Sequence, residues 1–187
     1  MKGIIIAHPW KESFNHAIFE KISRKLEDQN KNFISIDLYE NDFSPALSVQ
    51  ELSKFKDGLP LDLKVIEYQA ILKQVSELII IFPIWWYSMP AILKGFFDKV
   101  LLKNFAYTES PRGLIGQLTH ISKVTIITTS EGPTWYIKYF KGNFVKTVLI
   151  GGILKDIGIK NTKWINFPNI KKISKEKRVK FLEDLNV

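Results

Sequence analysis

Short apolar runs rich in β-branched residues alternate with helical hydrophobic patterns along this chain, and this alternation restricts its fold more than any other feature. Within each run, apolar and polar residues do not alternate. That is typical of strands buried on both faces of a parallel sheet. Four runs are clear and the fifth is weaker; they cover residues 3–7, 33–38, 78–82, 124–128 and 162–166.

Helical patterns occupy the stretches between these runs. In the first pattern Ser13 is placed to cap the N-terminus, and one face is apolar. That face carries Phe14, Ala17, Ile18, Ile22 and Leu26. The later patterns cover residues 63–75, residues 92–101 with Pro90 in the first turn, residues 144–154 and a basic stretch near the C-terminus.

The alternation predicts one α/β domain over residues 1–187, with helices on both faces of a parallel sheet. This is a three-layer doubly wound fold, and five strands favour the order 2-1-3-4-5. In that order the switch point lies between the first and third strands, where ligands of such folds bind. The sequence therefore predicts a ligand site beyond Ala7 and Phe82.

Composition narrows the classes of function. The chain has no cysteine, which removes disulfides, thiolate metal sites and cysteine nucleophiles, and fits a reducing cytosol. Its net charge of +8 favours anionic ligands such as phosphorylated cofactors. No nucleic-acid recognition module accompanies the charge, so we interpret the lysine-rich residues 171–180 as the exposed face of a terminal helix, and expect no nucleic-acid partner.

No signal peptide or membrane span is expected. The start of the chain lacks the long apolar stretch and small-residue cleavage site of a signal peptide. The most apolar segment, residues 78–93, is too short for a span and contains two prolines. We therefore expect a cytoplasmic protein without membrane insertion.

The loop after the first run, AHPWKESFN at residues 7–15, enters the first predicted helix. A helix N-terminus is an anion site because its N–H groups are free and its dipole end is positive. His8, Ser13 and Asn15 add side-chain donors. Neither GxGxxG nor GxxxxGK[ST] is present, and the alternative is that Ser13 only caps the helix while His8 packs.

Two further loops follow the third and fourth runs. FPIWWYSMP, residues 82–90, holds three consecutive aromatics between two prolines, which suits the wall of a flat heterocycle such as isoalloxazine. The alternatives for this loop are core packing or a subunit interface. TTSEGPTWY, residues 128–136, has small hydroxyl residues and Gly132, which allow the backbone to approach the edge of a ring closely. Trp135 and Tyr136 would then overhang that ring. The alternative for this segment is a plain strand-to-helix turn.

Together these segments resemble the flavodoxin-like NAD(P)H:quinone oxidoreductases, the group that contains DT-diaphorase, bacterial quinone reductases and ancillary flavoproteins of potassium-efflux systems. The resemblance extends from Gly3 to about Leu154 and is most specific in FPIWWYSMPAILKGFFDKVL, residues 82–101, continued by FAYT at residues 105–108. It implies a flavodoxin-like fold, a bound FMN or FAD, ping-pong hydride transfer from NAD(P)H through the flavin to a quinone-like acceptor, and a homodimer with active sites at the subunit interface.

The resemblance also implies site residues. Tyr136 matches a tyrosine beside the flavin ring, and Tyr107 matches an aromatic that projects towards the acceptor pocket; with Glu131 they are the candidate catalytic residues. The segment that contacts the flavin phosphate and ribityl chain is matched by His8, Ser13, Phe14 and Asn15. The segments that flank the ring and its polar edge are matched by Pro83, Ile84, Trp85, Trp86, Tyr87, Thr128, Thr129, Ser130 and Glu131.

The chain departs from the group at three places. Ser130 and Glu131 stand where DT-diaphorase-like members have paired glycines, which brings a carboxylate close to the flavin. No histidine occurs in residues 137–142, where those members have one in a proposed charge relay. The chain after Leu154 is shorter than in long FAD-binding members, which favours FMN. Two other functions remain open, a flavodoxin-type electron carrier and a redox-regulatory subunit of a transporter.

Overall fold

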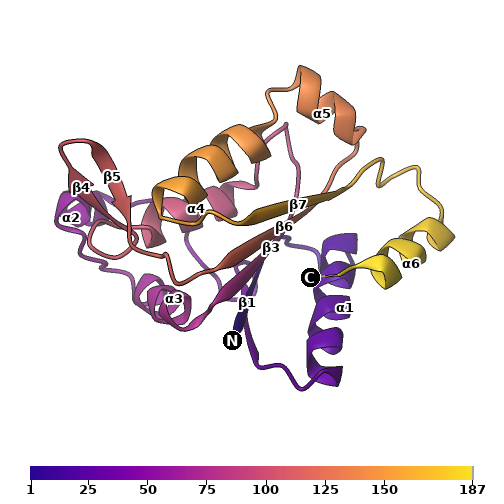
Figure 1. The fold of residues 1–187 in the computed structure, drawn as a ribbon, viewed down its shortest axis with the longest axis horizontal. Coiled ribbons are helices and arrows are strands. Elements are labelled where there is room, and N and C mark those ends of the chain that lie inside the picture. The colour runs from indigo at the N-terminus through magenta and orange to yellow at the C-terminus, as the bar shows by residue number, and fades with distance from the viewer. Residues whose placement is uncertain (187) are drawn as a thin grey trace.

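Five parallel strands form the centre of the computed structural model, which describes residues 1–186. Their order across the sheet is β2-β1-β3-β6-β7, which confirms the predicted order 2-1-3-4-5 for the five buried runs (Figure 1). β1 pairs with both β2 and β3, so the switch point lies between β1 and β3 as expected. The strands are β1 (Lys2–Ile6), β2 (Phe33–Asp37), β3 (Glu77–Pro83), β6 (Lys123–Thr129) and β7 (Thr162–Phe167).

Alternate residues of the strands pack into two different hydrophobic layers. Ile5 and Ile80 belong to a layer with helices α3 and α4 and the π-helix η2, whereas Ile4 and Ile6 pack with α1 and the C-terminal segment around α6. Each fully buried isoleucine contributes about 1.5–3 kcal/mol of hydrophobic stabilisation. Both faces of the sheet are therefore covered, which explains why the central strands β1, β3 and β6 are apolar over most of their length.

The predicted helices form, with one change at a terminus. The Ser13 hydroxyl accepts a hydrogen bond from the His16 N–H and caps α1 as expected. Pro90 is the N-cap residue of α4 and lies before the first turn rather than in it; its missing N–H is equally harmless there. These helices are α1 (Phe14–Asp28), α3 (Leu63–Gln74), α4 (Ala91–Val100), η2 (Val145–Leu154) and α6 (Lys175–Asp184).

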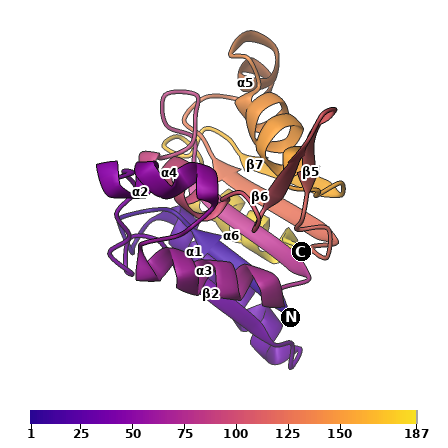
Figure 2. The ribbon, with the colours of Figure 1, turned by 90° about the vertical axis from the view of Figure 1, so that its left-hand side faces the viewer.

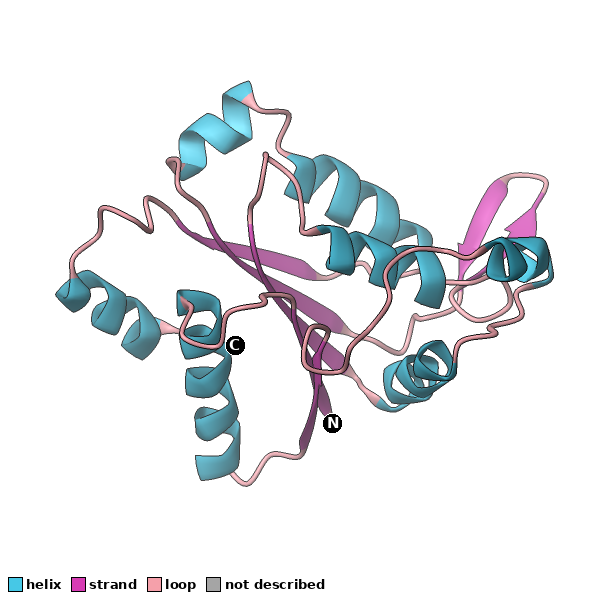
Figure 3. Ribbon diagram, turned by 180° about the vertical axis from the view of Figure 1, so that it is seen from behind, coloured by secondary structure: helices cyan, strands magenta, loops and turns pink. Residues whose placement is uncertain are grey.

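Several short elements were not predicted. An antiparallel hairpin follows α4 and lies at the left end of the molecule in Figure 1, well apart from α5 at the top (Figures 1 and 3). Trp135 and Tyr136, expected in a loop, lie instead in the first turn of α5. These elements are α2 (Val49–Lys54), η1 (Phe55–Asp57), β4 (Tyr107–Ser110), β5 (Gly113–Gly116) and α5 (Thr134–Phe140).

The segment between β2 and α3 is held against α4 by one buried lysine. Lys99 is 3% exposed, and its ammonium lies 2.9 Å from the Glu51 carboxylate and 2.8 Å from the Asp62 carboxylate. It also donates to the Ser44 carbonyl over 3.0 Å. Figure 2 shows α2 and α4 on this side of the molecule. Across residues 1–186, no helix combines the length and apolar character that a membrane crossing requires.

Candidate functional site

The loops that follow β1, β3 and β6 meet at the carboxyl edge of the sheet. They line two adjoining cavities of about 360 Å³ and about 700 Å³. Both cavities share four lining residues, so together they form one crevice with a smaller and a larger end. The shared residues are Ile84, Trp85, Ser130 and Glu131.

The smaller cavity opens onto the N-terminus of α1. Ten of the residues singled out in the sequence line it, and five others were missed: Trp10, Glu12, Ile170, Lys171 and Arg178. The ten are His8, Ser13, Phe14, Asn15, Pro83, Ile84, Trp85, Thr129, Ser130 and Glu131.

His8 is held in one tautomer at this cavity. The Trp10 N–H donates to His8 Nδ1 over 3.1 Å, which leaves Nε2 as the protonated nitrogen of the neutral ring. Burial and the neighbouring His16 lower the pKa of His8 from 6.5. At neutral pH this side chain is therefore an uncharged N–H donor.

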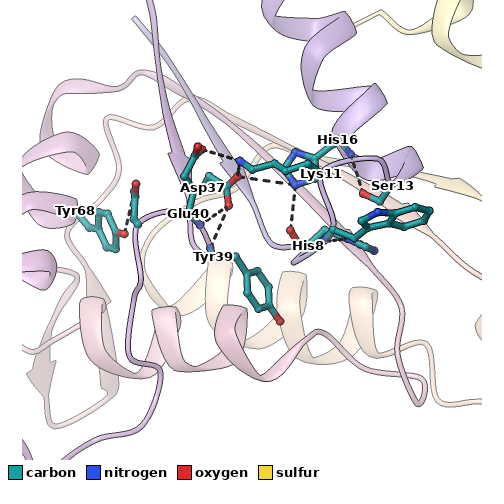
Figure 4. Close-up of polar contacts among 10 residues, drawn as sticks. His8, Lys11, Ser13, His16, Asp37, Tyr39, Glu40 and Tyr68 are labelled. Atoms are coloured by element: carbon teal, nitrogen blue, oxygen red, sulfur yellow. Dashed lines mark hydrogen bonds and ion pairs between the residues drawn. The ribbon is translucent and has the colours of Figure 1, made fainter.

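A polar network ties the first loop to the end of β2 (Figure 4). The Lys11 ammonium lies 2.7 Å from both the Asp37 and the Glu40 carboxylates. Partial burial opposes the charge on Lys11, but these two carboxylates outweigh it and raise its pKa. Below the same loop, His16 Nε2 donates to the His8 carbonyl over 3.1 Å. The path of the backbone around His8 is thus fixed from both sides.

Asn15 and the two threonines at the end of β6 have structural partners. Asn15 is 3% exposed and donates to Thr129 Oγ1 over 3.0 Å, which links α1 to β6 beneath the cavity. Thr128 is fully buried, receives the Trp164 indole N–H over 2.9 Å and donates to Asn166 over 2.7 Å. Thr128 lines neither cavity and supports the end of β6 through these bonds; its contact with a cofactor stays a prediction.

Two basic residues from the C-terminal region complete the smaller cavity. Arg178 donates to the Ile170 carbonyl over 2.7 Å and lies over the Phe14 ring, 5.9 Å from its centroid. Its Nε is buried without a hydrogen-bond partner among residues 1–186. Lys171 forms an ion pair of 2.7 Å with Glu131. The sequence signal for both was the lysine-rich run, which was interpreted only as an exposed face.

The larger cavity is bounded by a tight aromatic turn. Trp85 and Ser88 exchange two backbone hydrogen bonds of 3.0 and 2.9 Å, and the intervening Trp86 and Tyr87 have φ of 48° and 61°. Two consecutive left-handed residues that are not glycine are energetically unfavourable, at about 1–2 kcal/mol each. The turn directs the N–H groups of Trp86 and Tyr87 away from any partner in the described chain.

The opposite wall comes from the loop after β6 and from α5. Ser130 is 4% exposed and its N–H donates to the Phe167 carbonyl over 3.0 Å, so this N–H is not available to a ligand. The N–H groups of Glu131 and Gly132 donate to no described residue. Tyr136 contacts Tyr87 edge to face, with 6.3 Å between the ring centroids, so the two rings adjoin in the lining of this cavity. The larger cavity is lined by Ile84, Trp85, Trp86, Tyr87, Ser130, Glu131, Gly132, Pro133, Tyr136 and Ile137.

Tyr107 does not join this site within one chain. It belongs to β4, pairs with Gly116 and packs against the main core. Its hairpin lies far along the molecule from α5, which carries Tyr136 (Figure 1). Within one protomer Tyr107 thus lies apart from the larger cavity, and its projection towards the acceptor pocket of a homodimer stays a prediction.

Known proteins share the fold of this chain. A family model described as flavodoxin-like fold matches residues 3–186. An NAD(P)H oxidoreductase of Haemophilus influenzae is 32% identical over 182 residues, which is 96% of this chain and 89% of the relative. The solved NAD(P)H:quinone oxidoreductase from Methanothermobacter marburgensis superposes with a TM-score of 0.86 at 25% identity, covering 97% of this chain and 91% of that one.

The name of a further relative includes its cofactor. The FMN-dependent NADH:quinone oxidoreductase of Mycoplasma mycoides is 30% identical over 144 residues, or 68% of this chain. This chain spans 66% of that relative and 54% of the rat NAD(P)H dehydrogenase [quinone] 1. The fold, the match over almost the whole chain and the full-length relative agree: the chain belongs to the flavodoxin-like family that includes the NAD(P)H:quinone oxidoreductases.

Proposed function

We propose that this chain is an FMN-dependent NAD(P)H oxidoreductase that reduces quinone-like acceptors. The observation that carries this function is the single crevice with a polar, basic end at the start of α1 and an aromatic end of about 700 Å³. A phosphate suits the first end, and a planar ring with a second planar substrate suits the other.

The residues of the smaller cavity fit a flavin phosphate. Its donors are the free N–H groups at the start of α1, the His8 ring and the cations Lys171 and Arg178. The buried, unpartnered Nε of Arg178 is the kind of donor that a bound anion would satisfy. Ser13 and Asn15 position α1, since their side chains are bonded to His16 and Thr129.

The residues of the larger cavity fit the ring. Bound FMN supplies the hydride chemistry between the nicotinamide and the acceptor. The N–H groups of Glu131 and Gly132 are placed to stabilise negative charge at the ring's edge, in the manner of an oxyanion hole. Trp86 and Tyr87 form one wall of the cavity, and the hydroxyl of the adjoining Tyr136 orients the second substrate or donates a proton to it.

A homodimer completes the proposed enzyme. Large aromatic side chains around the larger cavity stay uncovered in one protomer: Trp86 is 96% exposed, Trp135 57%, Tyr139 78% and Phe140 68%. A second copy would cover them, and its β4–β5 hairpin would then supply Tyr107 to the acceptor pocket of the first. Sedimentation of the protein at assay concentration tests this point; a fully active monomer would contradict it.

The enzyme assignment has its own test. Protein purified with FMN, or reconstituted with it, is assayed at several fixed NAD(P)H concentrations while the quinone is varied. Parallel double-reciprocal lines are expected, because the reductant leaves before the acceptor binds. Bound FMN without NAD(P)H-dependent quinone reduction would favour an electron carrier instead.

A further inference from the structure

The ammonium of Lys141 lies beside Tyr87 and Tyr136, two tyrosines that line the larger cavity and contact each other edge to face. Its Nζ is 4.7 Å from the centroid of the Tyr87 ring and 5.4 Å from that of Tyr136. Phe140 stacks on Tyr136 at an interplanar angle of 18° and closes the outer side of this group. A cation is thus held over aromatic surface at the mouth of the cavity.

The charge of Lys141 is not neutralised by the protein. No carboxylate of residues 1–186 forms an ion pair with it, and residues 132–155 contain four lysines and no acidic residue. Glu131, the carboxylate that lines the cavity, is paired with Lys171. Lys138, one turn earlier, lies over the Trp164 ring instead, 5.3 Å from its centroid.

We propose that Lys141 forms an anion subsite at the mouth of the larger cavity and selects aromatic acceptors that carry an acidic substituent, a carboxylate or a sulfonate. This inference rests on the proposed function for its reaction, but not for its binding step. An acceptor ring that binds in the larger cavity against Tyr87 and Tyr136 brings an acidic substituent towards Nζ, which lies over both tyrosine rings. The ammonium then exchanges a weak contact with ring faces for an ion pair.

The same cation could meet a phosphate of the nicotinamide, so the experiment separates the two anions. The rates with naphthoquinone sulfonate and with unsulfonated naphthoquinone are compared under saturating NADH and then NADPH. The variants are Lys141→Met, which keeps the length of the side chain without its charge, and Lys141→Arg, which keeps the charge. Lys138→Met is the matched control, since Lys138 lies in α5, three residues before Lys141, and its ammonium lies over Trp164.

In Lys141→Met the ratio of kcat/KM for the sulfonated over the unsulfonated quinone falls by about two- to fivefold, the range of an exposed ion pair. Lys141→Arg and Lys138→Met keep the wild-type ratio. In wild type the ratio also falls at about 1 M salt, where the screening length is about 3 Å. Equal losses for both quinones, or a loss confined to NADPH, would overturn the subsite for acidic acceptors.

A binding measurement separates this inference from the enzyme assignment. Naphthalene sulfonate and the neutral naphthalene methanol are titrated against the purified protein while tryptophan fluorescence is followed. Lys141→Met should weaken binding of the sulfonate and leave that of the alcohol unchanged. If the protein reduces no quinone but shows this difference, the proposed function fails and the subsite stands; if both compounds bind both proteins alike, the subsite is wrong.

Discussion

The Glu131 carboxylate, in the loop after β6, lies 2.7 Å from the Lys171 ammonium, in the segment after β7. A carboxylate close to a flavin repels the negative charge that the ring carries when it is reduced. The structure reduces that effect, because Glu131 is 68% exposed and paired with a cation that lines the same cavity. Repulsion from Glu131 and attraction to Lys171 therefore act on a bound flavin together.

This pair predicts opposite shifts of the flavin midpoint potential. Glu131→Gln should raise the potential by about 10 mV, since an exposed charge contact is worth about 0.5 kcal/mol and the transfer involves two electrons. Lys171→Gln should lower it by a similar amount, and the double variant should lie near wild type. Redox titration at low salt measures these shifts, and a lower potential in Glu131→Gln would eliminate the repulsion.

The left-handed turn at Trp86 predicts a gain in stability at the expense of cofactor binding. Trp86→Gly should raise the free energy of unfolding by about 0.5–1 kcal/mol, because glycine adopts φ of 48° without steric cost and the side chain is almost fully exposed. FMN should dissociate faster, since one wall of the cavity is lost.

Asn30→Gly is the control for this turn. Asn30 also has a positive φ, 51°, but asparagine tolerates that region and the residue lies outside both cavities. It should change stability little and leave FMN release unchanged. Denaturant unfolding of the FMN-free proteins measures these changes. A lower free energy of unfolding for Trp86→Gly than for wild type would show that the backbone at Trp86 is not strained.

The Ser13 cap of α1 is expected to contribute both to the stability of the protein and to its affinity for FMN. Ser13→Ala removes the hydrogen bond to the His16 N–H and should cost about 1 kcal/mol. It should also weaken FMN binding, because the start of α1 lines the smaller cavity. Ser48→Ala removes a comparable cap from α2, outside both cavities, so it should lose stability without losing FMN affinity. Equal FMN affinity in both variants would count against the phosphate site.

The buried lysine of α4 predicts a large loss of stability. Lys99→Met leaves the Glu51 and Asp62 carboxylates without their shared cation, which should cost about 3 kcal/mol and lower Tm by roughly 10 °C. Lys94→Met, which breaks the exposed pair with Asp98 on the same helix, should cost less than about 0.5 kcal/mol.

The ion pair between Glu51 and Lys99 makes the stability of the protein depend on pH. Burial opposes ionisation of Glu51, but the Ser48 N–H and the Lys99 ammonium outweigh it and hold the pKa of this carboxyl below its ordinary value of 4.5. Its stabilisation is present above pH 4.5 and is lost as the pH falls through the lowered pKa. Lys99→Met should therefore lose less stability than wild type in acid. Identical acid profiles for the two proteins would contradict the coupling.

The local parts of the fold could be predicted from the sequence. Continuous β-branched runs gave the five strands and their order, and Ser13 with the apolar spacing after it gave α1, since these signals lie within a few residues of each other. The three loops could be brought together because parallel strands end at one edge of the sheet. The hairpin from Tyr107 could not be placed, because its pairing and its distance from Tyr136 depend on packing around α4.

Contacts between distant segments were also beyond the sequence. Arg178 reaches the smaller cavity because Phe181 of α6 packs on Phe14 and on Phe167 at the end of β7, and no local pattern encodes that approach. Thr128 and Thr129 are neighbours, yet only Thr129 meets the cavity, because alternate residues of a strand point to opposite faces. The two left-handed aromatics were equally hidden, since neither residue type favours that conformation.

Anaerobic reduction of the FMN-loaded protein by NAD(P)H tests whether a flavin in the crevice at the switch point takes hydride from a nicotinamide. In a stopped-flow experiment the visible flavin band should bleach within the turnover time and return when naphthoquinone is added. Ser13→Ala should need more FMN to give the same amplitude, whereas Ser48→Ala should not. A protein that binds no FMN, or whose bound FMN keeps its full absorbance under excess NADH and NADPH, would contradict the proposed oxidoreductase function.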